Sequence, residues 1–349
     1  MSLPKITKAA ILVAQNQPLE IAEIALPRTL EAGQVLVEVF YSGICGSQLG
    51  EIDGAKGPDK FLPHLLGHEG SGKVLAVGPG VRKVAAGDIV VLHWRKGPGI
   101  EAATPVYDWN GEKVNAGWVT TFNQYAVISE NRLTAIPADS NIRIAPLFGC
   151  AVTTGFGVVT NDAKLQIGES VVVAGAGGIG LNIVQAAAMA SAWPVIAVDL
   201  VAEKLALAKS LGATHTIDAS REDVKARIRE ILGAQALDAF IDNTGQPSVI
   251  EMGYELAAPE GRVILVGVPR KGNTIDIYSL PLHFGKILKG SHGGDAKPER
   301  DILRYLRLYN EGRIPLKDIV TDEFSLDDIN EAIARMRSGK IRGRCLIKM

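Results

Sequence analysis

The run from Val171 to Gly180, VVVAGAGGIG, constrains the fold more than any other stretch of the chain. Three β-branched residues lead into the pattern Gly-x-Gly-x-x-Gly, and an alanine-rich segment typical of a helix follows from Leu181 to Ala190. In a strand–turn–helix unit, the first glycine permits the tight turn and the second lets the backbone approach a pyrophosphate. The third lets the helix pack closely on the strand. A second apolar run, PVIAV at 194–198, predicts the next buried strand.

An acidic residue closes this second strand. Asp199 stands where an acidic side chain accepts both hydroxyls of an adenosine ribose and repels a 2′-phosphate. We therefore expect NAD rather than NADP; the alternative is a βαβ turn that binds nothing. The candidate cofactor contacts in the turn are Gly175, Gly177, Gly178, Ile179 and Gly180.

Length and composition exclude several classes of protein. With 349 residues and 47% apolar content the chain has material for a large core, and its length suggests two domains. A net charge of −1 without a basic run gives no support for a nucleic-acid or anionic-membrane partner. The apolar stretches are shorter than the ~18–20 residues of a membrane span, and the N-terminal segment does not resemble a secretion signal. Three widely separated cysteines do not form a disulfide framework, which indicates a cytoplasmic protein.

The strand and helix patterns divide the chain into regions. From Lys8 to about Ile128, short strands separated by Gly, Pro and Asp turns predict a β-rich region. From Gly168, strands alternate with helices, which predicts a doubly wound parallel sheet, an α/β fold. The expected order after Asp199 is helix 202–211, strand 214–217, helix 221–232, strand 237–241, helix 249–257, strand 262–266 and a short strand at 274–278. A helix over 298–310 and a strand over 344–348 leave this pattern.

The cofactor domain is therefore expected to be an insertion. We predict a Rossmann-type NAD-binding domain over residues 151–291. Residues 1–150 together with 292–349 then form the β-rich domain.

Four residues outside the glycine turn suggest a metal site. Singly, Cys45 and Cys150 read as small buried hydrophobes, and His68 beside Glu69 reads as a polar pair. Together they supply two thiolates and one imidazole with an adjacent carboxylate. Two cysteines, one histidine and an open position form the ligand set of a catalytic tetrahedral zinc.

Six motifs agree in order, spacing and type with one family. They are GICGS at 43–47, GHEG at 67–70, GD at 87–88, GC at 149–150, TTG at 153–155 and GAGGIG at 175–180. Over essentially its whole length the chain resembles the zinc-containing medium-chain dehydrogenase/reductase family. The resemblance implies a GroES-like catalytic domain, a Rossmann domain and an active site in the cleft between them.

The resemblance also implies roles for single residues. Cys45, His68 and Cys150 match the zinc ligands, and Glu69 matches a carboxylate that can approach the metal during ligand exchange. Ser47 matches the hydroxyl that takes the proton from the bound alcohol. The implied cofactor contacts are Thr154 under the nicotinamide, Val266, Gly267 and Val268 at the carboxamide, Asp199 and Lys204 at the adenosine ribose, and Arg344 (or its neighbour Arg342) at the pyrophosphate.

Three positions depart from the family pattern. Gln48 stands where many members have an acidic partner of the ligand histidine; an amide raises imidazole basicity less, which leaves the zinc a stronger Lewis acid. Gly50 stands where a histidine often relays the proton, so water, the cofactor ribose or another residue must serve. Residues 95–119 lack the four cysteines of a structural zinc, so we expect one catalytic zinc and no structural zinc.

The expected reaction transfers a hydride between an alcohol and NAD. The hydroxyl loses its proton to Ser47 under the influence of zinc, and the hydride passes to C4 of the nicotinamide. By register after the GD motif, His93 and Trp94 are expected at the substrate pocket, where they would suit a polyol or sugar-like alcohol. The alternative is that both side chains only pack beneath a loop.

Other functions remain as alternatives. A zinc-independent enone or quinone reductase shares the fold, but such relatives generally lack the paired cysteines at 45 and 150. A non-catalytic binding protein of this fold would not need the ligand set and Ser47. Oxidation of a thiol–aldehyde adduct would need an anion-binding pocket, for which Arg95 and Lys96 are candidates. The partners expected are a small alcohol or carbonyl substrate and copies of the same chain, in a homodimer or homotetramer joined along the Ile264 and Ile275 strands.

Overall fold

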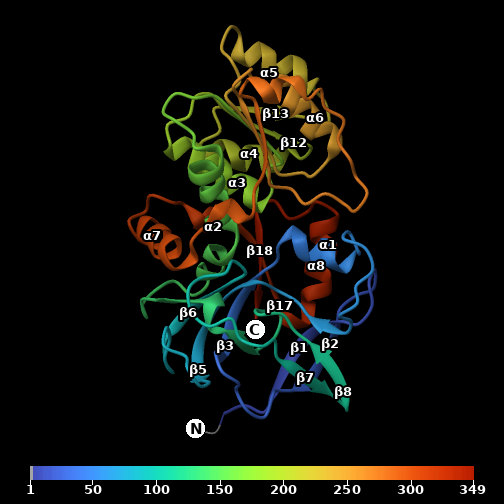
Figure 1. Cartoon of the computed structure of the whole chain (residues 1–349), viewed down its shortest axis with the longest axis vertical. Coiled ribbons are helices and arrows are strands. Elements are labelled where there is room, and N and C mark those ends of the chain that lie inside the picture. The colour runs from blue at the N-terminus through green and yellow to red at the C-terminus, as the bar shows by residue number, and fades with distance from the viewer. Residues whose placement is uncertain (1–2) are drawn as a thin grey trace. The chain divides into compact units, whose positions relative to one another are not determined.

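The computed structural model describes residues 3–349 and divides the chain into two compact units. Of the described residues, 3–150 and 297–349 form the first unit, and 151–296 form the second. The chain thus returns to the first unit at Lys297, five residues after the boundary read from the sequence. Figure 1 labels many of the helices and strands of both units. Among residues 3–349, no helix is both long and apolar enough to cross a membrane.

A closed barrel forms one part of the first unit. Its strands, in order, are β1 (Ile6–Leu12), β2 (Glu20–Ala25), β7 (Val106–Trp109), β8 (Glu112–Asn115) and β4 (His64–Leu65). Strand β1 is buried on both faces: Ala9 and Ile11 pack with Ile24, whereas Ala10 and Leu12 join a different cluster. Successive side chains of a strand point to opposite faces, so two clusters require the continuous apolar run seen in the sequence.

The β7–β8 hairpin occupies the region in which the sequence predicts no structural zinc. Asn110 (φ 55°) and Gly111 (φ 91°) form its two-residue loop, and both have positive φ. Asn-Gly with positive φ at both positions is the preferred two-residue hairpin turn. This hairpin was not predicted from the sequence, although the Asn-Gly pair is a signal for it.

Two of the candidate metal ligands, Cys45 and His68, lie at the ends of inner strands of the second sheet of this unit. The strands of this sheet, in order, are β10 (Leu133–Ile136), β6 (Ile89–His93), β5 (Glu69–Val77), β3 (Gln34–Gly43), β18 (Arg344–Lys348) and β17 (Val320–Ser325), with β9 (Tyr125–Ser129) also paired to β3. Leu346 of β18 pairs with Gly43 of β3, so the final strand lies beside the segment that leads into Cys45. The helices of this unit are α1 (Gly46–Ile52), α7 (Pro298–Asn310) and α8 (Ile329–Arg337), with 3₁₀ turns at Glu130–Arg132, Ala145–Gly149, Leu316–Asp318 and Leu326–Asp328.

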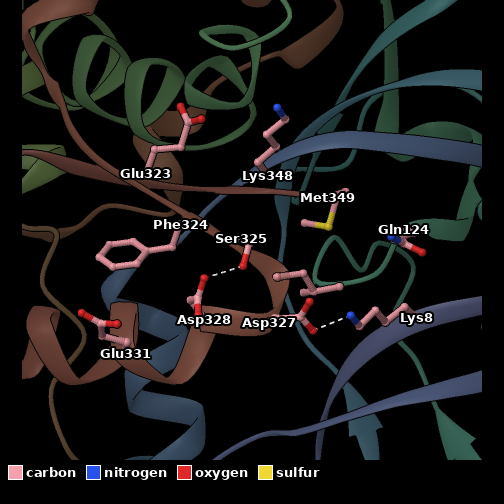
Figure 2. A pocket seen from close by; sticks show the side chains of 11 residues that line it. Lys8, Gln124, Glu323, Phe324, Ser325, Asp327, Asp328, Glu331, Lys348 and Met349 are labelled. Atoms are coloured by element: carbon pink, nitrogen blue, oxygen red, sulfur yellow. Dashed lines mark hydrogen bonds and ion pairs between the residues drawn. The ribbon is translucent and has the colours of Figure 1, made fainter.

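A hollow of about 590 Å³ lies where the C-terminal return meets β1 (Figure 2). Lys8 forms an ion pair with Asp327 there, and Ser325 Oγ donates a hydrogen bond of 2.5 Å to Asp328. None of the candidate site residues lines this hollow.

The second unit is a doubly wound parallel sheet, as the sequence predicts. The strand order is β13 (His215–Asp218), β12 (Val195–Asp199), β11 (Val171–Ala174), β14 (Ala239–Asp242), β15 (Arg262–Leu265) and β16 (Ile287–Gly290). Helices α3 (Gly178–Met189), α4 (Ala202–Ser210), α5 (Val224–Leu232) and α6 (Pro247–Leu256) connect the strands and flank them (Figure 1), after α2 (Ala151–Gly157) and a π-helical turn at Val158–Ala163. One cluster joins Val172 of β11 to Ile228 of α5 and Tyr254 of α6, which places these helices on one face.

One expected strand is wrong. Residues 274–278 form an extended segment outside the sheet, and the sixth strand is β16 instead. The Asp276 amide donates 2.8 Å to the Glu251 side chain rather than to a neighbouring strand. The alternation in TIDIY reflects a segment lying on the surface, whereas β16 has only Ile287 and Leu288 as apolar residues and gives a weak strand signal.

Candidate metal centre and cofactor turn

The structure brings Cys45, His68 and Cys150 together in the first unit. Their ligand atoms all lie within 4.8 Å of one another, and both cysteines are buried. Cys45 follows β3 and precedes α1, His68 lies between β4 and β5, and Cys150 follows the 3₁₀ turn at 145–149. Three loops from separate parts of the sheet therefore meet at one point.

Glycines next to two of these ligands allow the loops to approach. A Cβ on Gly67, which has a φ of +90°, would lie 2.3 Å from Thr121 Oγ1. A Cβ on Gly149 would lie 2.3 Å from the carbonyl oxygen of Leu92. The glycines in the GHEG and GC motifs are thus required by packing around the site.

Gln48 connects two of the three ligands. The Cys45 amide donates 2.9 Å to Gln48 Oε1, and Gln48 Nε2 contacts Nδ1 of His68. The Gln48 side chain is almost wholly buried. The group beside the ligand histidine is therefore a neutral amide and not a carboxylate.

The donor atoms fit a metal ion. His68 Nε2 is buried and has no hydrogen-bond partner among residues 3–349. The neighbouring Cys150 thiol lowers the pKa of Cys45 well below its usual value, and the charges of His68 and Arg344 add to this effect against the cost of burial. Two cysteine sulfurs, one with a lowered pKa, and a buried ring nitrogen are the groups that a Cys₂His zinc site requires.

Ser47 lies in the first turn of α1, two residues after Cys45. Its Oγ is buried and has no hydrogen-bond partner within the described chain. The hydroxyl is therefore available to an incoming group at the metal site.

Glu69 and Arg344 form a buried ion pair in the first unit. The Glu69 carboxylate, which is 0% exposed, contacts Arg344 Nη2, and the Arg344 side chain is 4% exposed. Neighbouring Arg342 is exposed. Of the two arginines, Arg344 is thus the one placed beside the metal-site loop, where its charge compensates the buried carboxylate.

The structure separates the two residues expected at the substrate pocket. His93 is 1% exposed, with Nδ1 2.7 Å from the Arg95 carbonyl oxygen and Nε2 3.0 Å from Thr134 Oγ1. Both ring nitrogens are engaged, which favours the packing alternative for this residue. The Trp94 ring instead lies edge-on to the His68 ring, with centroids 6.4 Å apart.

We expect His93 to make folding sensitive to acid. Burial lowers the pKa of His93 from 6.5 to about 4, so between these values the unfolded chain binds a proton that the folded chain does not. The free energy of unfolding should therefore fall as the pH falls through this window, by about 3 kcal/mol at this residue. Denaturant unfolding from pH 7 to 4 measures the effect. The difference in the free energy of unfolding between wild type and His93→Gln should shrink toward acid pH.

The glycine turn of the second unit has the geometry expected for each glycine. Gly175 has a φ of +93°, and a Cβ on Gly180 would lie 1.8 Å from the Gly175 carbonyl oxygen. No heavy atom lies within 4 Å of a Cβ built on Gly177, which caps the N-terminus of α3. Gly178 and Ile179 form the first turn of that helix. The turn therefore leaves open space directly before a helix N-terminus.

The Asp199 side chain is hydrogen-bonded to the backbone of this turn. Its carboxylate accepts 2.7 Å from the Ala176 amide and 3.0 Å from the Val201 amide. Each carboxylate oxygen still has acceptor capacity for a further hydrogen bond. Asp199 ends β12, and Gly175 follows β11, so both lie at the carboxyl edge of the parallel sheet.

The remaining candidate cofactor residues also belong to the second unit, except Arg344. Residues 266–268 follow β15 at the same carboxyl edge, with Val268 60% exposed. Gly267 passes close to the next loop, since a Cβ there would lie 2.2 Å from the Gly245 amide nitrogen. Lys204 is half-buried in α4, and Thr154 is buried in α2.

Asp242, which was not singled out from the sequence, ends β14 at this edge. Its carboxylate accepts hydrogen bonds from the Thr244 hydroxyl (2.6 Å) and the Gly245 amide (2.9 Å), and burial raises its pKa. Asp242 thereby shapes the loop that faces Gly175 and Gly267. The sequence DNTG after an apolar strand was the signal for this turn.

Comparison with known proteins agrees with this geometry. Residues 31–138 match the model of the alcohol dehydrogenase GroES-like domain, and residues 178–310 match that of the zinc-binding dehydrogenases. An NDMA-dependent alcohol dehydrogenase of Amycolatopsis methanolica is 34% identical, covering 97% of this chain and 98% of its own. An S-(hydroxymethyl)glutathione dehydrogenase of Haemophilus influenzae is 33% identical, covering 96% and 95%. The crystal structure of benzyl alcohol dehydrogenase from Acinetobacter calcoaceticus superposes with a TM-score of 0.89 at 30% identity, covering 99% and 100%.

Proposed function

Because the chain belongs to the zinc-binding medium-chain alcohol dehydrogenases, we propose that it oxidises an alcohol to the corresponding carbonyl compound with NAD and one zinc ion. The observation that carries the proposal is the cluster of Cys45, His68 and Cys150 with the Ser47 hydroxyl beside it. Family membership places the chain among oxidoreductases acting on CH–OH donors.

Each residue of the site has a separate role in the proposed reaction. Zinc, when bound by the three ligands, supplies the Lewis acidity that makes an alcohol easier to deprotonate. Ser47 Oγ accepts the hydroxyl proton, since its oxygen is free to do so. Gln48 orients His68 and the Cys45 backbone, and Arg344 holds Glu69 beside the ligands. Gly50 has no side chain that could accept and pass on a proton, so the proton leaves Ser47 through water or the cofactor ribose.

One zinc per chain is part of the proposal. Residues 95–119 contain no cysteine, and the β7–β8 hairpin occupies much of this segment. The three cysteines of the chain are all free, in keeping with a proposed location in the cytoplasm.

A zinc and substrate assay tests the function. We expect about one zinc per chain by elemental analysis of protein purified without added metal. NAD should be reduced with at least one member of a panel of benzyl alcohol, 2,3-butanediol, a sugar alcohol and S-(hydroxymethyl)glutathione. Active protein without zinc, or reduction of an enone or quinone without alcohol oxidation, would instead support the zinc-independent reductase alternative.

Asp199 carries the proposed choice of NAD over NADP. We expect Asp199→Asn to lower kcat/KM for NAD by about 10–100-fold, because hydrogen bonds to a charged group contribute roughly 1.5–3 kcal/mol. The same variant should improve the use of NADP relative to NAD. Asp218→Asn, at the matching end of β13, is the control, because its carboxylate bonds Ser220 in its own turn. Equal losses in both variants, or unchanged cofactor preference, would contradict the assignment.

A homodimer formed along the edge of the Rossmann sheet is the proposed assembly. The strands named from the sequence are not at this edge: Ile264 lies in β15, between β14 and β16, and Ile275 is outside the sheet. The edge is β16, beside which Tyr278 and Phe284 are each 71% exposed and Ile287 is 45% exposed. Exposed apolar residues along an unpaired strand edge favour pairing with a second copy. Light scattering of the purified protein distinguishes the dimer from a tetramer or a monomer.

A further inference from the structure

Asp162 carries a buried carboxylate in the second unit that has no role in the reaction described above. It lies in the π-helical turn at Val158–Ala163, directly after α2. One carboxylate oxygen accepts a hydrogen bond of 2.6 Å from Lys289 Nζ, and the other accepts one of 2.6 Å from Ser291 Oγ. The Asp162 side chain is 0% exposed, so water competes little for its oxygens. Such charge-assisted hydrogen bonds are stronger than those between neutral groups.

Both partners of Asp162 belong to the end of β16 and the loop that follows it. The Ser291 amide donates 2.8 Å to the Leu265 carbonyl oxygen, so this loop begins beside the residue that precedes Val266. The carboxyl ends of the parallel strands β15 and β16 therefore meet here. Ligands of doubly wound folds bind at this edge of the sheet. Asp162 thus fixes a loop on the cofactor side of the second unit.

The loop after β16 packs directly against α2. Gly293, Gly294 and Asp295 have consecutive positive φ values of 64°, 65° and 47°. A Cβ on Gly294 would lie 2.5 Å from the Thr154 carbonyl oxygen, and a Cβ on Gly157 would lie 2.3 Å from the Gly294 carbonyl oxygen. The two segments thus touch backbone to backbone, which requires glycine at both positions. A shift of this loop would therefore shift the helical turn that carries Thr154.

The hydrogen bonds continue from Asp162 into the loop itself. The Gly294 amide donates 2.9 Å to Ser291 Oγ, the same oxygen whose proton is donated to Asp162. Asn161 Nδ2 donates 2.8 Å to the Gly294 carbonyl oxygen. The hydrogen bond to Asp162 also raises the pKa of Lys289, which keeps the ammonium charged at neutral pH. Asp162 is therefore the only charged acceptor in a network that joins the π-helical turn to the loop.

We infer that Asp162 is a positioning residue, which holds the loop after β16 against α2 and thereby sets the place of Thr154 beneath the nicotinamide. The inference rests on the proposed function, in which Thr154 and residues 266–268 meet the nicotinamide half of NAD. Asp162 acts through the loop, because Lys289 and Ser291 already engage both of its oxygens. A misplacement of about 1 Å is enough to slow a reaction roughly 10²-fold, so this packing affects hydride transfer.

The two halves of the cofactor can be tested separately. The ribose site proposed at Asp199 lies at the end of β12, and β11, β14 and β15 separate that strand from β16. Loss of the Asp162 contacts should therefore affect the nicotinamide half alone. ADP-ribose contains the adenosine and the pyrophosphate but no nicotinamide. The ratio of the dissociation constants of NADH and ADP-ribose thus isolates the contribution of the nicotinamide half.

Asp162→Asn keeps the size of the side chain and places an amide donor against one of the two donors. We expect the NADH dissociation constant, measured by isothermal titration calorimetry, to rise about tenfold, the lower end of what a charged hydrogen bond contributes. That of ADP-ribose should change by less than about twofold. With an alcohol that wild type oxidises, kcat should fall about 10–100-fold. Asp162→Glu, which restores the charge, should recover part of the NADH affinity.

Asp238→Asn is the matched control. Asp238 also accepts from a serine, since the Ser170 hydroxyl donates 2.9 Å and the Ser170 amide 2.8 Å to its carboxylate. Asp238 directly precedes β14 and so lies at the amino edge of the same sheet. This variant should lower the free energy of unfolding without changing the ratio of the two dissociation constants. If Asp162→Asn does not fold, Ser291→Ala carries the test, because it removes one of the two contacts and should change the ratio in the same direction.

The outcomes separate the role of Asp162 from the proposed function. An unchanged ratio in Asp162→Asn, the same change in Asp238→Asn, or equal weakening of NADH and ADP-ribose would overturn the positioning role while leaving the proposed function standing. Wild-type protein that binds neither ligand would contradict the proposed function and the inference together.

Discussion

Replacing Cys45 by serine is expected to abolish zinc binding and to lower kcat/KM by about 10⁴-fold, because Lewis-acid stabilisation contributes several kcal/mol to the barrier. Serine lacks the thiolate that the neighbouring Cys150, His68 and Arg344 favour at this position. Zinc content by elemental analysis, beside the rate of NAD reduction, measures both effects.

The third cysteine provides the matched control. Cys345 is fully buried in β18, and burial raises its pKa to about 12, so it is a neutral thiol in the core. Cys345→Ala should reduce stability by about 1–2 kcal/mol through lost packing while keeping the zinc. Retention of zinc and activity in Cys45→Ser, or loss of zinc in Cys345→Ala alone, would refute the ligand assignment.

Gly180→Ala is expected to destabilise the second unit by about 4 kcal/mol, above the usual range for overpacking because the obstacle is backbone. The added Cβ would lie 1.8 Å from the carbonyl oxygen of Gly175, which cannot move without changing the turn itself. Thermal unfolding of the variant measures the loss, and NAD binding should fall with it.

Gly177→Ala separates the fold from the cofactor. Space around Gly177 is open and its φ is −77°, so alanine there should change the free energy of unfolding by less than about 1 kcal/mol. The methyl group would instead occupy the space proposed for the pyrophosphate, so NAD affinity should fall at least about tenfold. If Gly177→Ala unfolds the protein while Gly180→Ala does not, the roles assigned to these glycines are wrong.

The parallel sheet could be predicted from sequence because strands buried on both faces leave continuous apolar runs between clear turns. Val171–Ala174 and Val195–Asp199 are such runs, and both are strands of the Rossmann sheet. Alternation alone was misleading at 274–278, because it reports which side chains are exposed and not whether a neighbouring strand is available. The edge strand β16 was not predicted, because its side chains are mostly exposed and only two of its four residues are large and apolar. Its sequence therefore lacks the continuous apolar run of the inner strands.

The candidate metal ligands could be selected from sequence only as a set and through the family resemblance. Their spacing of 23 and 82 residues carries no local signal, and the sheet order alone brings them together. The environment of His93 could not be read from the chain, because its partners are the Arg95 carbonyl and Thr134 on the adjacent strand β10. The pairing of Glu69 with Arg344 could not be predicted from the sequence either, because the two residues are far apart in the chain and only the fold brings them together.

The ion pair between Glu69 and Arg344 links formation of the metal site to the order in which the chain is synthesised. Glu69 leaves the ribosome early, whereas β18, which carries Arg344, is synthesised only after the whole second unit. A carboxylate buried without a cation is strongly unfavourable, so the loop that holds His68 cannot close stably around Glu69 before β18 adds to β3. The metal site should therefore mature late, and a nascent chain halted before Arg344 should hold its cysteines open to alkylation.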